Sequence, residues 1–154
     1  MTNLSSKVLA ALSDKTLVTA ESLTGGGIGA ALTAVSGASA VFKGGVISYT
    51  NEVKHAVLGV PEHILETYGA VSRWTAGYMA SGVRKLLAAD VAVSVTGLAG
   101  PGADEFGNPV GTVFIGYEDS RQAVVKHCLF SGSREEIRRQ TIETALQLIL
   151  EYNA

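Results

Sequence analysis

The segment from Val91 to Thr96 is apolar except at Ser94 and at its last residue, Thr96. A strand with one face in water alternates apolar and polar residues, whereas a strand covered on both faces is apolar throughout. Such strands occur in sheets that carry helices on both sides. This segment therefore predicts a central strand of a sheet with a layer of helices on each face.

Helical and strand-like segments alternate along the first part of the chain, which is typical of an α/β fold. The first four predicted helices cover residues 4–12, 28–35, 52–58 and 62–68. Asn51 is the expected cap of the third, and Pro61 is expected at the first helical position of the fourth. A longer helix is capped by Ser72, and a last helix begins at Ser133 with a capping box. The predicted strands cover residues 16–19, 46–50, 91–96, 110–117 and 123–130. We expect a three-layer helix-sheet-helix sandwich with a mixed, mostly parallel sheet and a late β-hairpin.

A single domain over residues 1–154 suits this length, because a core of that size buries about two thirds of the surface of the unfolded chain. Hydrophobic residues make up 47% of the chain, charged residues 17%, and the mean hydropathy is +0.27. These values are typical of a folded protein and not of a disordered one. The low share of charged side chains favours contact between subunits, so we expect a homo-oligomer.

The formal net charge is −2, and no block of lysine and arginine interleaved with aromatic residues occurs. Nucleic acid is therefore not an expected partner. The first residues lack the order of features of a signal peptide, and no apolar run approaches the roughly 20 residues needed to cross a bilayer. We expect a cytoplasmic protein with no membrane partner.

The residues that commonly bind metals are scattered. His55, His63 and His127 form no closely spaced ligand pair, and Cys128 is the single cysteine. A lone cysteine in a strand-like run is more often a buried apolar residue than a ligand. The sequence predicts neither a metal site nor a disulfide, and we expect no cofactor.

Glycine accounts for 18 of the 154 residues, and it gathers in loops that follow predicted strands, where open α/β sheets bind their ligands. One such loop places Ser22 and Thr24 between a strand and a helix, followed by Gly25 and Gly26. Backbone N–H groups in such a turn can hold an anion or a developing oxyanion. A serine or threonine before a helix is nevertheless more often a simple cap.

Two further segments follow predicted strands. Residues 48–54 carry a phenol, an amide and an amine, and residues 96–102 form a glycine-rich loop; their candidate residues are Tyr49, Asn51, Lys54, Thr96, Gly97 and Gly100. Taken singly, a lysine is more often a solvated surface residue, and a glycine-rich loop can be a flexible surface connection.

The chain offers no histidine or cysteine nucleophile system. The groups that remain for acyl chemistry are the hydroxyls of Ser22 and Thr24, with Lys54 or Tyr49 as the base. A serine with a lysine base is a known variant of the nucleophile and base arrangement.

Five short motifs, in this order, resemble the C-terminal domain family of the competence and damage-inducible protein CinA. They are AESLTGG at 20–26, YTNEVK at 49–54, GAVS at 69–72, TGLAGP at 96–101 and PVGTV at 109–113. The resemblance covers nearly the whole chain, from about residue 19 to about residue 150. It departs at Leu23, where many relatives have cysteine, a position that is not the expected nucleophile.

The resemblance implies a nicotinamide-nucleotide amidase, which converts nicotinamide mononucleotide and water to nicotinate mononucleotide and ammonia in pyridine nucleotide salvage. The larger family members carry an additional N-terminal domain, so this chain resembles the stand-alone amidase form. The family's nucleophile falls on Ser22 and its lysine base on Lys54, with Tyr49 nearby and Arg138 at a functional arginine. The expected substrate-binding residues are Thr24, Gly25, Gly26, Asn51, Thr96, Gly97 and Gly100.

In the expected mechanism neutral Lys54 removes the proton from Ser22, whose oxygen attacks the carboxamide carbon. This role requires burial or a neighbouring cation to lower the lysine pKa from about 10.4. Arg138 is the candidate for contact with the phosphate or with transition-state charge. Two alternatives stay open: a nucleotide-binding, regulatory homologue without catalysis, and a different hydrolase or phosphotransferase of the same fold, which a metal requirement would favour.

Overall fold

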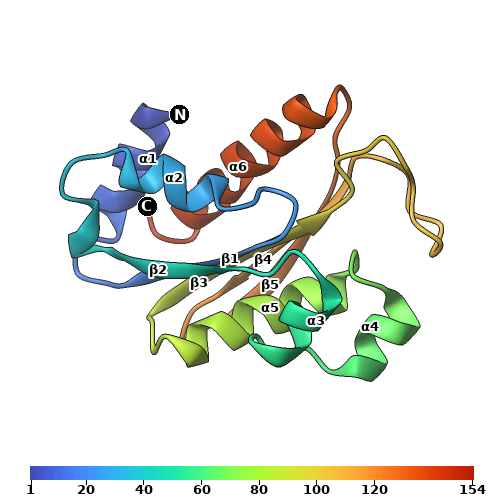
Figure 1. Cartoon of the computed structure of the whole chain (residues 1–154). Coiled ribbons are helices and arrows are strands. Elements are labelled where there is room, and N and C mark those ends of the chain that lie inside the picture. Colours follow the sequence, from blue (N-terminus) through green and yellow to red (C-terminus); the bar gives the residue numbers. More distant parts are fainter.

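The computed structural model describes all 154 residues, arranged as a five-stranded sheet between two layers of helices (Figure 1). The strands are β1 (Leu17–Glu21), β2 (Phe42–Ile47), β3 (Val91–Gly97), β4 (Thr112–Glu118) and β5 (Ala123–Leu129). One face carries α1 (Thr2–Ala11), α2 (Gly27–Thr33) and α6 (Arg134–Glu151); the other carries α3 (Asn51–Ala56), α4 (Glu62–Tyr68) and α5 (Arg73–Leu86). A short 3-10 helix, η1 (Ala38–Ala40), precedes β2. The predicted three-layer sandwich is confirmed.

The strands lie in the order β2-β1-β3-β4-β5. β1 pairs in parallel with both β2 and β3, while β3 with β4 and β4 with β5 pair antiparallel. The sheet is therefore mixed, and the last two strands form the predicted hairpin. Because β1, β2 and β3 run in the same direction, their carboxyl ends meet at one edge of the sheet.

Apolar clusters fill the space on both faces of the sheet, which explains the uninterrupted apolar sequence of β3. Side chains alternate between the faces of a strand. Val91, Val93 and Val95 belong to the larger cluster with α1, α2 and α6, whereas Ala92 belongs to the smaller cluster with α5. Ser94 is buried without cost because its hydroxyl donates to the carbonyl of Ala76 at 2.6 Å.

The second strand begins and ends earlier than predicted. It covers Phe42–Ile47 and not residues 46–50, so Ser48, Tyr49 and Thr50 form a loop. The missed part contains Gly44 and Gly45, and glycine has a low strand propensity. Pairing with β1 overrides that propensity, and a Cβ at position 45 would overlap the side chain of Thr19.

Two helix starts also differ from the prediction. Thr50, and not Asn51, caps α3, with its hydroxyl accepting from the N–H of Val53 at 3.4 Å. Pro61 is the residue before α4 and not its first helical residue. The caps at Ser72 and Ser133 are confirmed, the latter with a complete capping box to Glu136.

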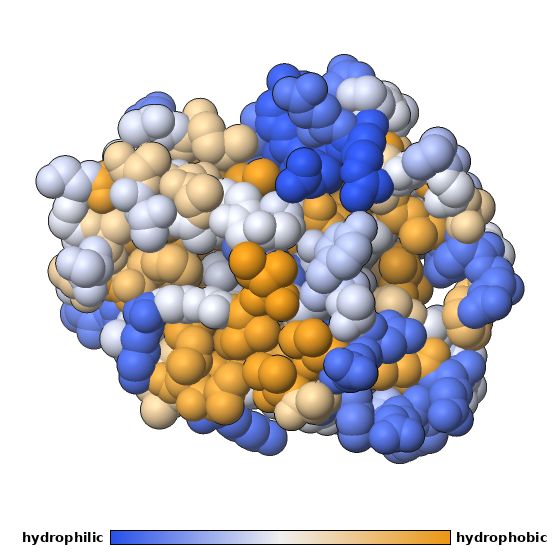
Figure 2. Space-filling view, in the orientation of Figure 1, coloured by the Kyte–Doolittle hydropathy of each residue, from blue (hydrophilic) through white to orange (hydrophobic).

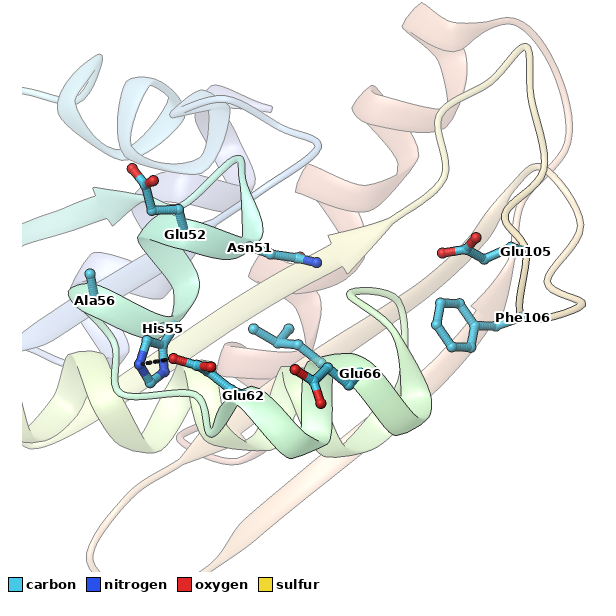
Figure 3. Close-up of a pocket in the computed structure, with 9 residues that line it drawn as sticks. Asn51, Glu52, His55, Ala56, Glu62, Glu66, Glu105 and Phe106 are labelled. Carbon is cyan, nitrogen blue, oxygen red and sulfur yellow. Dashed lines mark ion pairs between the residues drawn. The ribbon is translucent and has the colours of Figure 1, made fainter.

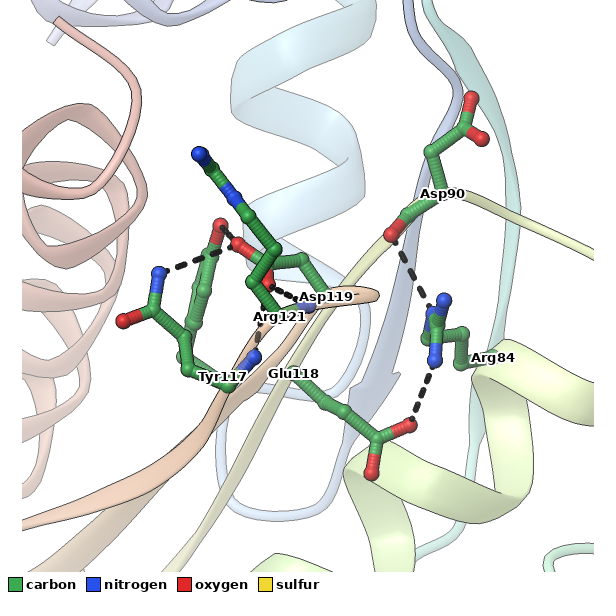
Figure 4. Close-up of polar contacts among 7 residues, drawn as sticks. Arg84, Asp90, Tyr117, Glu118, Asp119 and Arg121 are labelled. Carbon is green, nitrogen blue, oxygen red and sulfur yellow. Dashed lines mark hydrogen bonds and ion pairs between the residues drawn. The ribbon is translucent and has the colours of Figure 1, made fainter.

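A set of polar contacts joins α5 to the sheet at the edge opposite the carboxyl ends of β1 and β3 (Figure 4). The Arg84 guanidinium donates to Glu118 and to the carbonyl of Asp90, both at 3.2 Å. At the hairpin turn, burial raises the pKa of Asp119, but hydrogen bonds from Tyr117 and from the turn outweigh burial and lower that pKa to about 2. These contacts tie α5 and the hairpin turn to the sheet.

Figure 2 shows apolar surface gathered over β2, α3 and α5, in the lower half of the view. The large apolar or aromatic side chains exposed on these elements or directly beside them are Ile47, Tyr49, Val57, Trp74, Tyr78 and Leu86. None of the helices combines the length and the apolar character needed to cross a lipid bilayer.

Candidate active site

The candidate site lies at the edge of the sheet where the parallel strands end. Ser22 directly follows β1, and Lys54 is on α3, which follows β2. The loops after these strands are held together by the N–H of Ser22, which donates to Val95, and by the N–H of Ser48, which donates to Glu21 at 2.7 Å. Neighbouring parallel strands thus bring together two residues that are 32 positions apart.

Ser22 and Lys54 are in direct contact inside the protein. The Nζ atom of Lys54 lies 3.0 Å from the Oγ atom of Ser22, and it also contacts the carbonyl oxygens of Ser48 at 2.8 Å and Tyr49 at 3.3 Å. The lysine is 1% exposed and the serine 7% exposed. This geometry meets the distance requirement for proton transfer from a nucleophile to a base.

The surroundings of Lys54 favour its neutral form. Burial lowers the pKa of this amine from 10.5 to about 8, because removal from water penalises the charged form. All three of its hydrogen-bond partners are uncharged oxygens, so no carboxylate offsets this effect. A neutral amine in this position can donate to the two carbonyls and accept the hydroxyl proton of Ser22.

A cavity of about 340 Å³ opens in front of this pair. Its lining residues are Ser22, Leu23, Tyr49, Lys54, Ala70, Val71, Thr96, Gly97, Leu98, Ala99, Gly100, Gly102 and Arg134. The predicted site residues Tyr49, Thr96, Gly97 and Gly100 are thus brought to the same cavity as the serine and the lysine. No carboxylate, imidazole or thiol lines it, and no three such groups are clustered anywhere in the chain in a way that could hold a metal ion.

The loop between β3 and β4 forms one wall of this cavity. Its ends are pinned to each other, since the N–H of Leu98 donates to Thr112 at 2.9 Å and the N–H of Gly111 donates to Leu98 at 2.8 Å. On this wall the N–H groups of Ala99 and Gly100 donate to no other atom of the protein, nor does that of Leu23 opposite. Such free N–H groups are the kind that stabilise an oxyanion.

Glu21 is a buried residue of the site that the sequence analysis missed. Its carboxylate accepts hydrogen bonds from the hydroxyl of Thr24 and from the N–H groups of Ile28 and Gly29 at 2.9 and 3.0 Å. The start of α2 is therefore occupied by a side chain of the protein itself and is not open to an external anion. The available sequence signal was an acidic residue at the end of an apolar strand. An acidic side chain is rarely buried unless it is paired with hydrogen-bond donors or a cation.

Several predicted site residues lie outside the cavity. Thr24 is turned toward Glu21, while Gly25 and Gly26 shape the turn before α2 with φ angles of +57° and +99°. Arg138 does not line the cavity but supports the loop that carries Ser22, the expected nucleophile, since its guanidinium donates to the carbonyls of Leu23 at 2.9 Å and Thr24 at 3.2 Å.

Asn51 lines a different hollow, of about 550 Å³, between α3, α4 and the β3–β4 loop (Figure 3). This hollow contains four glutamates, Glu52, Glu62, Glu66 and Glu105, and an ion pair of 3.1 Å between His55 and Glu62. It is larger than the cavity at Ser22 but contains no paired nucleophile and base. The smaller cavity is therefore the candidate active site.

Arg134 is the one charged residue of the cavity lining that the sequence analysis did not select. It stands at the first position of α6 and donates to the carbonyl of Gly100 at 2.7 Å and to the hydroxyl of Tyr49 at 3.3 Å. The sequence analysis assigned the functional arginine to Arg138 from the family resemblance, and it gave no reason to select Arg134, four positions earlier on the same helix.

Comparison with known proteins matches nearly the whole chain to one family. The CinA C-terminal domain matches residues 1–153. A CinA-like protein of Endomicrobium trichonymphae is 47% identical over 135 residues, which cover 88% of this chain and 32% of that protein. The chain spans about a third of the length of the curated relatives it matches.

Solved structures of similar proteins have the same fold. A CinA superfamily protein from Klebsiella pneumoniae is 34% identical with a TM-score of 0.95, and the match covers 97% of this chain and 95% of that one. The competence/damage inducible protein CihA from Agrobacterium tumefaciens is 38% identical, also with a TM-score of 0.95, and the match covers 99% of this chain and 95% of that one.

Proposed function

Since the chain belongs to the CinA C-terminal domain family, we propose that it is a nicotinamide-nucleotide amidase that acts as one domain over residues 1–154. The reaction converts nicotinamide mononucleotide and water to nicotinate mononucleotide and ammonia. The observation that carries this proposal is the 3.0 Å contact between the buried amine of Lys54 and the hydroxyl of Ser22 at the wall of a cavity. A buried lysine with a lowered pKa beside a serine is one of the arrangements that activate a serine for acyl transfer.

In the proposed first step the Oγ atom of Ser22 bonds to the carboxamide carbon while its proton passes to the Nζ atom of Lys54. The carbonyl oxygen becomes an oxyanion, which the free N–H groups of Leu23, Ala99 and Gly100 stabilise. The carbon–nitrogen bond then breaks, and the proton on Lys54 passes to the departing nitrogen. Ammonia leaves, and the nicotinoyl group remains as an ester on Ser22.

Water completes the proposed cycle. Lys54, neutral again, takes a proton from a water molecule whose oxygen attacks the ester carbon. The bond to Ser22 breaks, and the proton returns from Lys54 to the serine oxygen. The product leaves as a carboxylic acid, which gives its proton to the released ammonia or to water and becomes the carboxylate, and the protein is restored without any oxidant, reductant or metal.

The experiment is an ammonia assay with purified protein and nicotinamide mononucleotide. We expect release of one ammonia for each nicotinate mononucleotide formed, loss of at least about a thousandfold in kcat for Ser22→Ala, and an unchanged rate after exhaustive chelation. Calorimetry with Ser22→Ala is the control, since this variant should still bind the nucleotide. Near wild-type turnover by Ser22→Ala would overturn the nucleophile. Binding without turnover by the wild type would indicate a regulatory nucleotide-binding protein, and activity restored only by a metal would indicate a different hydrolase.

A further inference from the structure

Arg134 is the one permanently charged side chain that lines the cavity, and no acidic side chain lines it, so the cavity suits a substrate with negative charge. Arg134 is exposed to solvent, whereas Lys54 lies buried at the inner end of the cavity and must be neutral to act as the base. Fixed positive charge without a compensating carboxylate raises the local concentration of anions. The volume of about 340 Å³ lies at the lower end of the range for small-molecule sites.

Three other groups near Ser22 that could bind an anion already have hydrogen-bond partners within the protein. Lys54 uses its three hydrogen-bonding positions on Ser22, Ser48 and Tyr49. The start of α2 is filled by the carboxylate of Glu21. Arg138 is outside the cavity and is bonded to backbone carbonyls of the nucleophile loop.

Arg134 differs from these groups because it has donors to spare. A guanidinium carries five N–H donors, and this one uses two of them, on Gly100 and Tyr49. It forms no ion pair, whereas Arg84 is paired with Glu118. Its position is not explained by helix stability either, since a cation in the first turn opposes the helix dipole.

We propose that Arg134 binds the phosphate of the nucleotide substrate and makes the site selective for the nucleotide over the unphosphorylated nucleoside. This inference rests on the proposed amidase function for the identity of the substrate. The planar guanidinium can present two parallel N–H groups to a phosphate, which gives both charge and orientation. Its bonds to Tyr49 and Gly100 fix it at the cavity without using all of its donors.

The test compares two substrates, nicotinamide mononucleotide and nicotinamide riboside, in Arg134→Met and in the matched control Arg139→Met. Arg139 is exposed on the same helix and does not line the cavity, so both variants remove one positive charge. We expect Arg134→Met to raise KM for the nucleotide by about 10- to 100-fold and to change kcat/KM for the riboside by less than about threefold. Arg139→Met should leave both substrates unchanged.

Equal losses for both substrates in Arg134→Met would overturn the proposal, because Arg134 would then act by positioning Tyr49 or the loop at Gly100. An equal effect of Arg139→Met would also overturn it, in favour of a general effect of charge. Calorimetric binding in the Ser22→Ala background separates this proposal from the proposed function. If the wild type releases no ammonia, the amidase function fails, but weaker nucleotide binding in Arg134→Met alone still supports phosphate recognition. Binding of neither compound overturns both.

Discussion

The pairing of Ser22 with Lys54 shows how far residue types alone can point toward a site. The serine, the lysine and Tyr49 were selectable as acyl-transfer groups because the sequence offers no alternative nucleophile system. Their contact was not deducible from spacing, since it depends on β1 and β2 being neighbours in the sheet. The role of Glu21 was also hidden, because its partners at positions 24, 28 and 29 become available only once α2 has formed.

At the residue scale, the activity should follow the ionisation of Lys54. The base must be neutral, and burial lowers its pKa to about 8. We expect kcat/KM for nicotinamide mononucleotide to rise about tenfold per pH unit from about pH 6.5 and to level off above about pH 8. Lys54→Arg keeps the charge but cannot act as a base near neutral pH, so it should lose nearly as much kcat as Lys54→Met.

The measurement is a series of kcat and KM determinations across this pH range, with circular dichroism to establish that each variant is folded. A flat profile, or a folded Lys54→Arg that retains most of the activity, would contradict the lysine base. It would move the assignment to Tyr49, whose hydroxyl is held by Arg134.

At the scale of elements, α5 contains two glycines whose surroundings differ. A Cβ at Gly82 would overlap the carbonyl oxygen of Leu58, whereas a Cβ at Gly77 would meet only Val125, at 3.8 Å. Gly82 therefore lets α5 pack closely against the chain that follows α3, and α3 carries Lys54. Gly77 has no comparable role, so it only weakens the helix.

We expect Gly82→Ala to lower the free energy of unfolding by about 1–3 kcal/mol through overpacking. Gly77→Ala should raise it by up to about 1 kcal/mol, because alanine has the higher helix propensity. Urea denaturation of both variants, analysed for the midpoint and the slope, provides the measurement. Shifts of the same sign in the two variants would contradict the close approach at Gly82.

At the scale of the whole molecule, the buried lysine should make the protein less stable than it could be. Between about pH 8, its folded pKa, and pH 10.5, the unfolded chain holds more protons on this amine than the folded one. The free energy of unfolding therefore rises with pH between about pH 8 and pH 10.5. Below about pH 8 the buried amine is charged, and it lowers the free energy of unfolding by its full amount. A pKa shift of this size corresponds to a loss of on the order of 3 kcal/mol in the free energy of unfolding. Lys54→Met removes this loss, but it also removes hydrogen bonds to two carbonyls, each worth about 1 kcal/mol.

Accordingly, Lys54→Met should unfold at a temperature at least as high as that of the wild type at pH 7, and the difference should shrink toward pH 10. Calorimetric melting curves at both pH values check this, with Lys85→Met, an exposed lysine on α5, as the control. A variant that melts well below the wild type at pH 7, or a gap that widens with pH, would show that the amine is not destabilised by burial.

The architecture was predictable because it depends on patterns that the sequence displays directly. The apolar run of β3 indicated a sheet covered on both faces, and the capping box at Ser133 marked the start of α6. β2 was misplaced because pairing with β1, and not local propensity, makes a strand of Gly44 and Gly45. The choice between Arg134 and Arg138 required the three-dimensional path of the β3–β4 loop, which brings Gly100 to α6.

The loop between the antiparallel strands β3 and β4 forms one wall of the cavity, and this loop can change in length and sequence. The ends of the loop are hydrogen-bonded to each other at Leu98 and Gly111, so we expect that residues beyond Ala99 and Gly100 can be inserted or removed without shifting either strand. Doubling the length of a flexible loop costs only about 0.6 kcal/mol in closure entropy. Ser22 and Lys54 are supplied by separate elements and would stay in place. Changes in this one loop can thus alter which molecules enter the cavity. The two residues of the proposed chemistry, Ser22 and Lys54, need not change.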